Sequence, residues 1–186
     1  MTTRKPPPET KPRFRWRRWL LGLLALLLLV LILLSFSSYE VETVIEIKAA
    51  PREVWAVLTD FPGYAAWHPY LKEVSGSPEP DQPLTLKYHF QGQPPRVVQG
   101  RVETAMPEME LRWHASWMLV RILDAEEYYL LDTAGLSPGT VRVRHGVRCT
   151  GLAVPFLRKQ MDRFLRQGLQ EMNEALRDRA QAQRRR

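Results

Sequence analysis

The chain has 186 residues, of which 45% are hydrophobic and 25% charged, and a formal net charge of +7. These values allow one ordinary domain with attachments and exclude a wholly disordered chain, a collagen and a disulfide-dense scaffold. A single cysteine, Cys149, excludes an intramolecular disulfide and a cysteine-based zinc site.

The positive charge is concentrated at the start of the chain. Residues 1–18 contain seven basic residues and one acidic residue, so all later residues together carry a net charge of only +1. A nearly neutral body argues against a nucleic-acid-binding domain. We expect residues 1–18 to form a basic, disordered cytoplasmic tail, because this segment contains Pro6-Pro7-Pro8 and no periodic apolar pattern.

Residues 19–36 contain no charged side chain and predict a single transmembrane helix. As a helix this segment spans about 27 Å, close to the thickness of a bilayer core. The positive-inside rule places the N-terminus in the cytoplasm and the rest of the chain on the extracytoplasmic side of a bacterial inner membrane. A cleaved signal peptide is the alternative, since Ser35 and Ser37 are small residues at a suitable spacing, and both interpretations export the domain.

The exported segment begins with a strand and two short helices. Apolar and charged residues alternate over residues 40–48, the pattern of a half-buried strand. Pro51 suits the first position of a helix, and Phe61-Pro62-Gly63 ends this helix before a second helical turn at residues 64–67.

A run of antiparallel strands and one long helix follow. Further strands are predicted at residues 71–76, 84–91, 96–105, 109–114, 119–132 and 140–150. After Pro155, apolar residues recur every three or four positions to about Leu176, which predicts a long amphipathic helix. One long helix on an antiparallel sheet makes an α+β domain at residues 39–178, and residues 179–186 are expected to be a basic disordered tail.

Three segments of this domain resemble the START-like (SRPBCC) superfamily, in its polyketide cyclase/dehydrase and lipid-transport branch. They are AAPREVWAVLTDFPGYAAWHPYL (residues 49–71), VRHGVRCTGL (residues 143–152) and LQEMNEALRDRAQ (residues 169–181). The resemblance implies a helix-grip fold, in which a bent antiparallel sheet wraps the C-terminal helix around an apolar ligand cavity. It carries no shared catalytic motif, so no catalytic residue is transferred.

In this fold, inward residues of the sheet and of the last helix are the candidates for the cavity wall. They are Tyr88, Phe90, Leu111, Trp113, His145, Met161, Phe164, Leu165, Gly168 and Met172. Gly168 stands out because glycine is unfavourable inside a helix and would leave room for a ligand or for close packing. His145 lies on an apolar strand face and is a candidate polar anchor or general base, or a buried structural histidine.

Together with these residues, the resemblance implies binding or transport of a lipid or other hydrophobic small molecule, and we favour this over catalysis. The alternatives are a cyclase or dehydratase that uses the same cavity, and a protein-interaction module. The sequence has no nucleophile elbow, phosphate loop or zinc-binding helix motif, and it indicates no metal and no cofactor. The identity of the ligand and the oligomeric state are not predicted.

Overall fold

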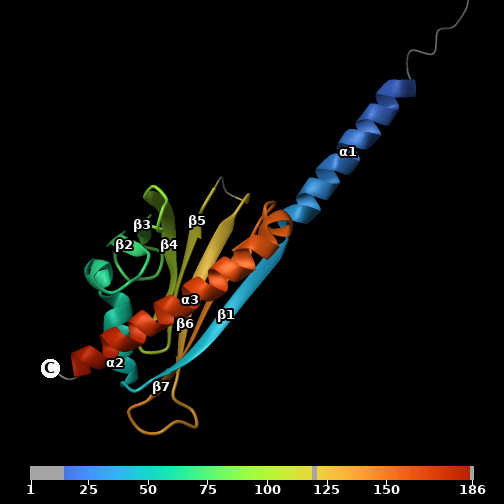
Figure 1. The fold of residues 1–186 in the computed structure, drawn as a ribbon. Coiled ribbons are helices and arrows are strands. Elements are labelled where there is room, and N and C mark those ends of the chain that lie inside the picture. The colour runs from blue at the N-terminus through green and yellow to red at the C-terminus, as the bar shows by residue number, and fades with distance from the viewer. Residues whose placement is uncertain (1–14, 119–120, 185–186) are drawn as a thin grey trace, which may run out of the picture.

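The structure, a computed structural model, describes residues 15–118 and 121–184. It consists of an N-terminal helix, α1 (Arg15–Ser35), that projects away from an α+β domain (Figure 1). Within the described residues, one helix, Trp16–Ser35, is long and apolar enough to cross a membrane, with a mean hydropathy of 2.5, and none of it is buried in the protein. A membrane anchor and an N-terminal signal sequence share these properties.

The domain contains one seven-stranded sheet in which every neighbouring pair of strands is antiparallel. The order across the sheet is β1-β7-β6-β5-β4-β3-β2. The strands are β1 (Ser38–Ile47), β2 (Leu71–Ser75), β3 (Pro83–Tyr88), β4 (Arg96–Met106), β5 (Glu110–Ser116), β6 (Asp124–Asp132) and β7 (Val141–Thr150). The first and last strands of the sequence are therefore neighbours.

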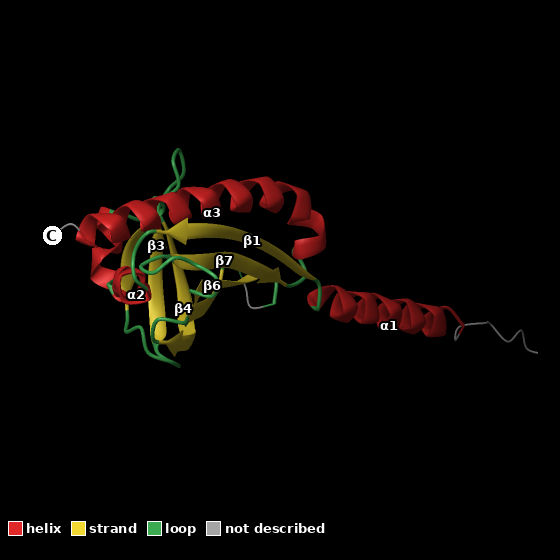
Figure 2. Cartoon of the chain, turned by 90° about the horizontal axis from the view of Figure 1, so that it is seen from below, coloured by secondary structure: helices red, strands yellow, loops and turns green. Residues whose placement is uncertain are grey.

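Two short helices connect β1 to β2, and one long helix follows β7. Helix α2 (Pro51–Thr59) starts with Pro51, and the Glu53 side chain accepts a hydrogen bond of 2.6 Å from the Ala50 backbone N–H. This hydrogen bond satisfies a backbone N–H at the start of the helix, which is the usual role of a carboxylate at the third helical position. The 3-10 helix η1 (Phe61–Ala66) follows, and α3 (Val154–Arg184) lies across one face of the bent sheet (Figure 2). The arrangement confirms the helix-grip fold.

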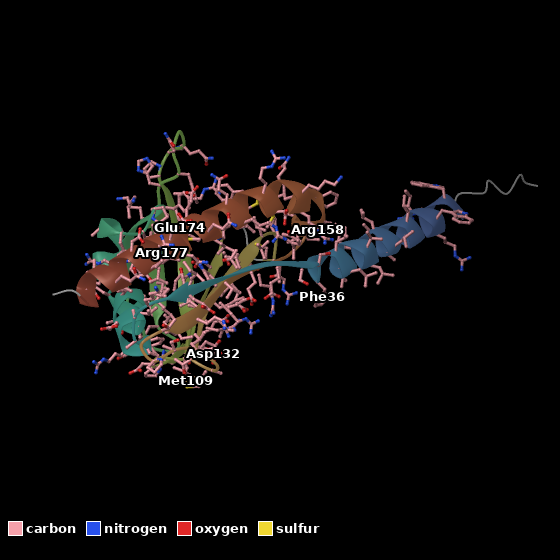
Figure 3. The ribbon with its side chains drawn as sticks, turned by 60° about the horizontal axis from the view of Figure 1, so that its bottom comes forward. Phe36, Met109, Asp132, Arg158, Glu174 and Arg177 are labelled. Atoms are coloured by element: carbon pink, nitrogen blue, oxygen red, sulfur yellow. The ribbon has the colours of Figure 1, made fainter. Side chains whose placement is uncertain are left out.

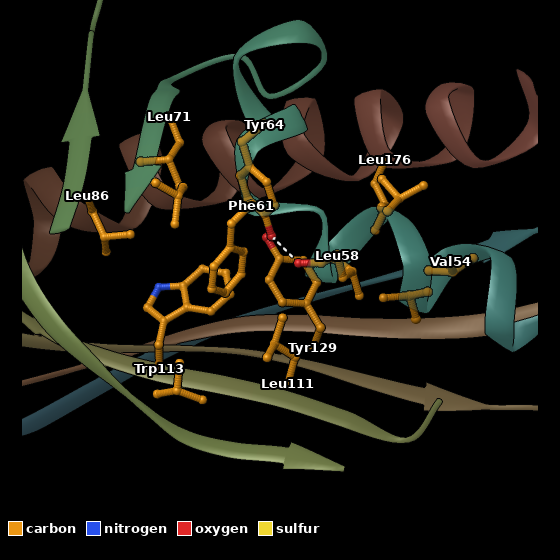
Figure 4. Close-up of a cluster of buried hydrophobic side chains, with 14 of the residues drawn as sticks. Val54, Leu58, Phe61, Tyr64, Leu71, Leu86, Leu111, Trp113, Tyr129 and Leu176 are labelled. Atoms are coloured by element: carbon orange, nitrogen blue, oxygen red, sulfur yellow. Dashed lines mark hydrogen bonds between the residues drawn. The ribbon is translucent and has the colours of Figure 1, made fainter. Parts of the chain in front are cut away.

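The apolar core forms two clusters along α3. In the larger one, the C-terminal half of α3 packs through Leu176 and Ala180 against α2, η1 and the sheet (Figure 4). The smaller one contains Val41, Val147 and Leu169 near the N-terminal half of α3. The helix therefore contacts a filled core at one end and a smaller cluster at the other.

The outer face of the sheet is charged. Arg148, Arg144 and Arg142 on β7 pair with Glu40, Glu42 and Glu46 on β1 at 3.0, 2.9 and 2.9 Å. The Tyr128 hydroxyl donates to carboxylates of this row, and its ring lies over Gly146, where a Cβ atom would be 2.3 Å from the Tyr128 hydroxyl oxygen. Only glycine leaves space for this ring.

Four expected element boundaries differ in the structure. Strand β6 begins at Asp124 instead of 119, because residues before it form a turn around Arg121, which has φ of 65°; residues 119–120 lie outside the described residues. Met109 belongs to a turn and is 60% exposed. The predicted tail at residues 179–186 is helical as far as Arg184, because α3 continues with Ala180 fully buried. The predicted tail at residues 1–18 overlaps α1 from Arg15 onward, and residues 1–14 lie outside the described part.

Candidate functional site: an apolar cavity beneath the last helix

A cavity of about 180 Å³ lies between the N-terminal half of α3 and the inner face of the sheet. Its walls are mainly aromatic and aliphatic. They comprise Tyr88, Phe90, Trp113, Ala115, Trp117, Leu123, Ala125, Glu127, Val147, Cys149, Met161, Phe164 and Leu165. Glu127 is the one acidic residue among these described lining residues, so the cavity favours an apolar ligand.

The mouth of the cavity is formed by four large side chains. Phe90, Trp117, Met161 and Phe164 line both the cavity and an open groove on the surface next to it. The Phe90 and Phe164 rings meet edge to face with centroids 5.3 Å apart, and Phe164 is 50% exposed. These side chains therefore separate the cavity from solvent.

The mouth lies at the end of the domain where α1 joins it. Ser38, the first residue of β1, pairs with Thr150 at the end of β7, and α3 begins shortly after, at Val154. The Gly151 backbone N–H donates to the Ser37 carbonyl oxygen at 3.1 Å. Figure 3 shows Phe36 and Arg158 near this junction, whereas Met109 and Asp132 lie at the far end of the sheet. The first turns of α3, which roof the cavity, thus lie beside the end of α1.

A buried polar network supports the inner wall of the cavity. His145 is fully buried, with Nδ1 2.9 Å from Asn173 Oδ1 and Nε2 3.1 Å from Glu127 Oε1. Asn173 Nδ2 donates to Thr43 Oγ1 at 2.9 Å, and the Tyr129 hydroxyl donates to Glu127 Oε1 at 2.9 Å. The Tyr129 ring also stacks on His145 with centroids 4.0 Å apart. The network therefore joins β1, β6, β7 and α3 and fixes the Glu127 carboxyl at the cavity.

His68 lies in the loop between η1 and β2 and is only 1% exposed. Its Nδ1 accepts hydrogen bonds from the Tyr70 and Leu71 backbone N–H groups at 3.2 and 2.9 Å. Burial lowers its pKa to about 3, with smaller contributions from His145 and Lys72. His68 is thus a neutral structural residue that holds the start of β2.

Two further groups near the cavity are held in their neutral forms. Burial raises the pKa of the Cys149 thiol to about 11, which keeps it protonated and a poor nucleophile near neutral pH. Burial also raises the pKa of the Tyr129 phenol well above its ordinary value, with the Glu127 carboxylate adding to this effect. Within residues 15–118 and 121–184, no group of three or more His, Cys, Asp or Glu side chains is arranged to hold a metal ion.

The structure places six of the expected lining residues at the cavity: Tyr88, Phe90, Trp113, Met161, Phe164 and Leu165. The other four lie elsewhere. Leu111 is in the filled core, His145 lies behind Glu127, and Met172 packs in the smaller cluster. Gly168 faces Tyr70, whose Cε2 would be 3.5 Å from an added Cβ atom, so this glycine borders close packing and not the cavity.

Sequence reasoning missed Glu127, the polar group of the cavity wall. It lies in the run Glu126-Glu127-Tyr128-Tyr129, where the same residue type occupies both strand faces and alternation cannot choose between them. The register with β7 resolves the ambiguity, because Glu127 lies opposite Val147 and Tyr129 opposite His145. Aligning this strand with the apolar face of β7 could have identified Glu127 from the sequence.

A bent antiparallel sheet, a long C-terminal helix and an apolar cavity between them define a domain of the helix-grip class. Residues 38–181 match the family described as polyketide cyclase / dehydrase and lipid transport, and the chain belongs to this family. A search of curated proteins found no match.

Solved structures with the same fold are distant in sequence. The di-domain ARO/CYC StfQ of the steffimycin biosynthetic pathway superposes with a TM-score of 0.65 at 9% identity, covering 78% of this chain and 51% of that protein. The Zhui aromatase/cyclase from Streptomyces sp. R1128 gives 0.62 at 15% identity, with 78% and 94% covered. A START superfamily protein from Mycobacterium smegmatis gives 0.60 at 18% identity, with 77% and 97% covered. The chain spans about half the length of the first of these proteins.

Proposed function

We propose that this protein binds an apolar small molecule in the cavity beneath α3 and exchanges it with the membrane to which α1 anchors it. The observation that carries the proposal is the position of the cavity mouth, at the same end of the domain as α1. A hydrophobic ligand that enters there leaves the bilayer and reaches a protein cavity without crossing much water.

The connection between α1 and the domain is short. Helix α1 ends at Ser35 and β1 begins at Ser38, and three peptide steps span at most about 11 Å. With residues 19–36 in an inner membrane and the N-terminus in the cytoplasm, the domain rests on the extracytoplasmic surface. The mouth then faces the outer leaflet.

The surface around the mouth suits a lipid interface. Phe36 and Phe156 are 70% and 76% exposed, which is unusual for large apolar side chains unless they meet an apolar partner. Arg158 and Lys159 are exposed close to Phe156 in the sequence, and the exposed Arg121 guanidinium lies over the Phe36 ring, 5.9 Å from its centroid. Basic side chains beside apolar ones favour contact with anionic headgroups and the acyl boundary.

The volume of the cavity limits the ligand. A cavity of about 150 Å³ accommodates a single aromatic ring, so 180 Å³ suits a small ring compound or part of an acyl chain. A complete diacyl lipid would need the mouth to open, with most of the lipid outside the domain.

A second candidate function is catalysis of a cyclase or dehydratase type. One observation favours it: the Glu127 carboxyl, hydrogen-bonded to His145, lies at the wall of an otherwise apolar cavity. A carboxyl in such a place can accept or donate a proton when a substrate lies within hydrogen-bond reach. Two of the structural neighbours carry names of aromatase/cyclases, which agrees with this candidate.

Native mass spectrometry of the full chain extracted in mild detergent tests the binding function. We expect a co-purifying small molecule with the wild-type protein and its loss from Ala125→Phe, which fills the cavity from β6. Val97→Phe is the matched control, because Val97 is 57% exposed on β4 and the same added ring meets solvent. Retention of the molecule by Ala125→Phe would place its binding site elsewhere.

Protease treatment of intact spheroplasts tests the orientation. We expect digestion of the domain and protection of residues 1–18. Protection of the domain would overturn the assignment to the extracytoplasmic side.

A further inference from the structure

The hydrogen bonds behind the cavity wall fix the position of each proton in turn. The Thr43 hydroxyl donates to the His145 carbonyl oxygen at 3.2 Å, so Thr43 Oγ1 accepts from Asn173 Nδ2 at 2.9 Å. The other atom of the Asn173 amide, Oδ1, is therefore an acceptor. It lies 2.9 Å from His145 Nδ1, which must carry a hydrogen.

With Nδ1 as the donor, His145 presents Nε2 to Glu127 Oε1 at 3.1 Å. This contact is a hydrogen bond only if one proton lies between the two atoms. The proton is on Nε2, giving an imidazolium and a carboxylate, or on Oε1, giving an imidazole and a carboxylic acid. The net charge of the pair is zero in both forms, and a second proton or the loss of this one would leave a buried charge without a partner.

One oxygen of the Glu127 carboxyl remains available as a hydrogen-bond acceptor. Tyr129 and His145 both contact Oε1, and no described residue makes a hydrogen bond with Oε2. The Glu127 side chain is 11% exposed and lines the cavity. An acceptor in apolar surroundings gains free energy from a donor that a bound molecule brings to it.

The same geometry selects the charge of that molecule. Because the Glu127–His145 pair is already neutral, a cationic ligand would bring a charge that no described lining residue compensates. A neutral O–H donor adds a hydrogen bond without adding charge. The aromatic walls formed by Tyr88, Phe90, Trp113 and Trp117 suit a ring as the apolar part.

We propose that Glu127 is the polar anchor of the cavity and selects neutral ring compounds that carry a hydroxyl group, such as phenols and cyclic alcohols. This inference rests on the proposed binding function and names the chemical class of the ligand. His145 and Tyr129 hold the carboxyl in place from the side away from the ligand.

Two probes of the same shape test the anchor. Isothermal titration calorimetry of the full chain in non-ionic detergent compares 4-ethylphenol with 4-ethyltoluene, in which a methyl group replaces the hydroxyl. A purely apolar cavity binds the methyl compound more tightly, because the phenol loses its hydrogen bonds to water. We expect the reverse order for the wild-type protein.

Removal of the acceptor should invert the preference. In Glu127→Leu, the ratio of the two dissociation constants should move toward 4-ethyltoluene by about 3- to 100-fold, the range from a hydrogen bond to a neutral acceptor to one to a carboxylate. Glu126→Leu is the matched control: Glu126 lies on the opposite face of β6, paired with Arg112, and this variant should keep the wild-type ratio.

The possible results separate the anchor from the binding function. Tighter binding of 4-ethyltoluene by the wild-type protein overturns the anchor while leaving cavity binding intact, and this comparison holds even if Glu127→Leu does not fold. An unchanged ratio in folded Glu127→Leu also overturns the anchor. If the wild-type protein binds neither probe, the binding function is overturned and the anchor with it.

Discussion

Replacement of His68 by asparagine should change how the stability of the domain depends on pH. Nδ1 of His68 accepts two backbone hydrogen bonds, and a proton on this atom would break both. The Asn side-chain oxygen can take the place of Nδ1 as the acceptor, and it does not titrate. The His68→Asn variant therefore keeps the hydrogen bonds and removes the ionisable group.

The magnitude follows from the two pKa values of His68. Its pKa is lowered from 6.5 in the unfolded chain to about 3 in the folded domain, so the folded state binds fewer protons. The stabilising contribution is fully present above pH 6.5 and is lost as the pH falls from 6.5 toward 3. The lowering of the His68 pKa corresponds to about 5 kcal/mol of unfolding free energy in total, of which about 3 kcal/mol is lost between pH 7 and pH 4.5.

Urea unfolding of the full chain in mild detergent, followed by tryptophan fluorescence, measures this contribution. At pH 7 the variant should be less stable than the wild type, because asparagine loses the stacking of His68 on Tyr64. Between pH 7 and pH 4.5, the unfolding free energy of the wild type should fall by about 3 kcal/mol more than that of the variant. The exposed His89→Asn is the control. Parallel pH profiles of wild type and His68→Asn would refute the argument.

Three further predictions concern Cys149 and two glycines. Because burial raises the pKa of Cys149 to about 11, N-ethylmaleimide should label it at pH 7 at least about 100-fold more slowly than a small free thiol, as followed by mass spectrometry; labelling at the free-thiol rate would contradict its buried position. Gly146→Ala should lower the unfolding free energy by about 1 to 3 kcal/mol, because its Cβ atom would collide with the Tyr128 ring. The loss should shrink in the double variant with Tyr128→Ala, and full additivity would rule out this contact as the cause. Gly168→Ala should raise the unfolding free energy by up to about 1 kcal/mol, since its Cβ atom would lie 3.5 Å from Tyr70; destabilisation in urea would show that this site is tighter than described.

Periodicity was sufficient to predict most of the fold. The alternation in residues 40–48 and 140–150 placed the two strands that the structure pairs from Ser38–Thr150 to Ile47–Val141. The boundary of β6 could not be predicted in the same way, because the turn before it depends on a positive φ at Arg121. Glycine or asparagine would have indicated this conformation, but arginine does not.

The site was harder to predict because it depends on contacts between distant segments. The apolar stripe of α3 suggested its inner face, yet the side chains most deeply buried on α3 include Asn173, a polar residue that sequence patterns assign to solvent. Its burial depends on hydrogen bonds with Thr43 and His145 on two other strands. Cavities likewise arise where side chains from several elements fail to meet, and periodicity within one element does not contain that information.

The two halves of α3 pack against different surroundings. Leu176 and Ala180 anchor the far half in the filled core, whereas Met161 and Phe164 cover empty space near α1. Moving the cavity-side half of α3 outward would break the contacts of Val154 and Leu169 in the smaller cluster and leave those of Leu176 and Ala180 in place. Its free-energy cost would therefore be that of a local opening and not of unfolding the domain. If the proposed ligand passes beneath the cavity-side half, substitutions there would change the rate of its passage, whereas substitutions around Leu176 and Ala180 would change the lifetime of the folded state.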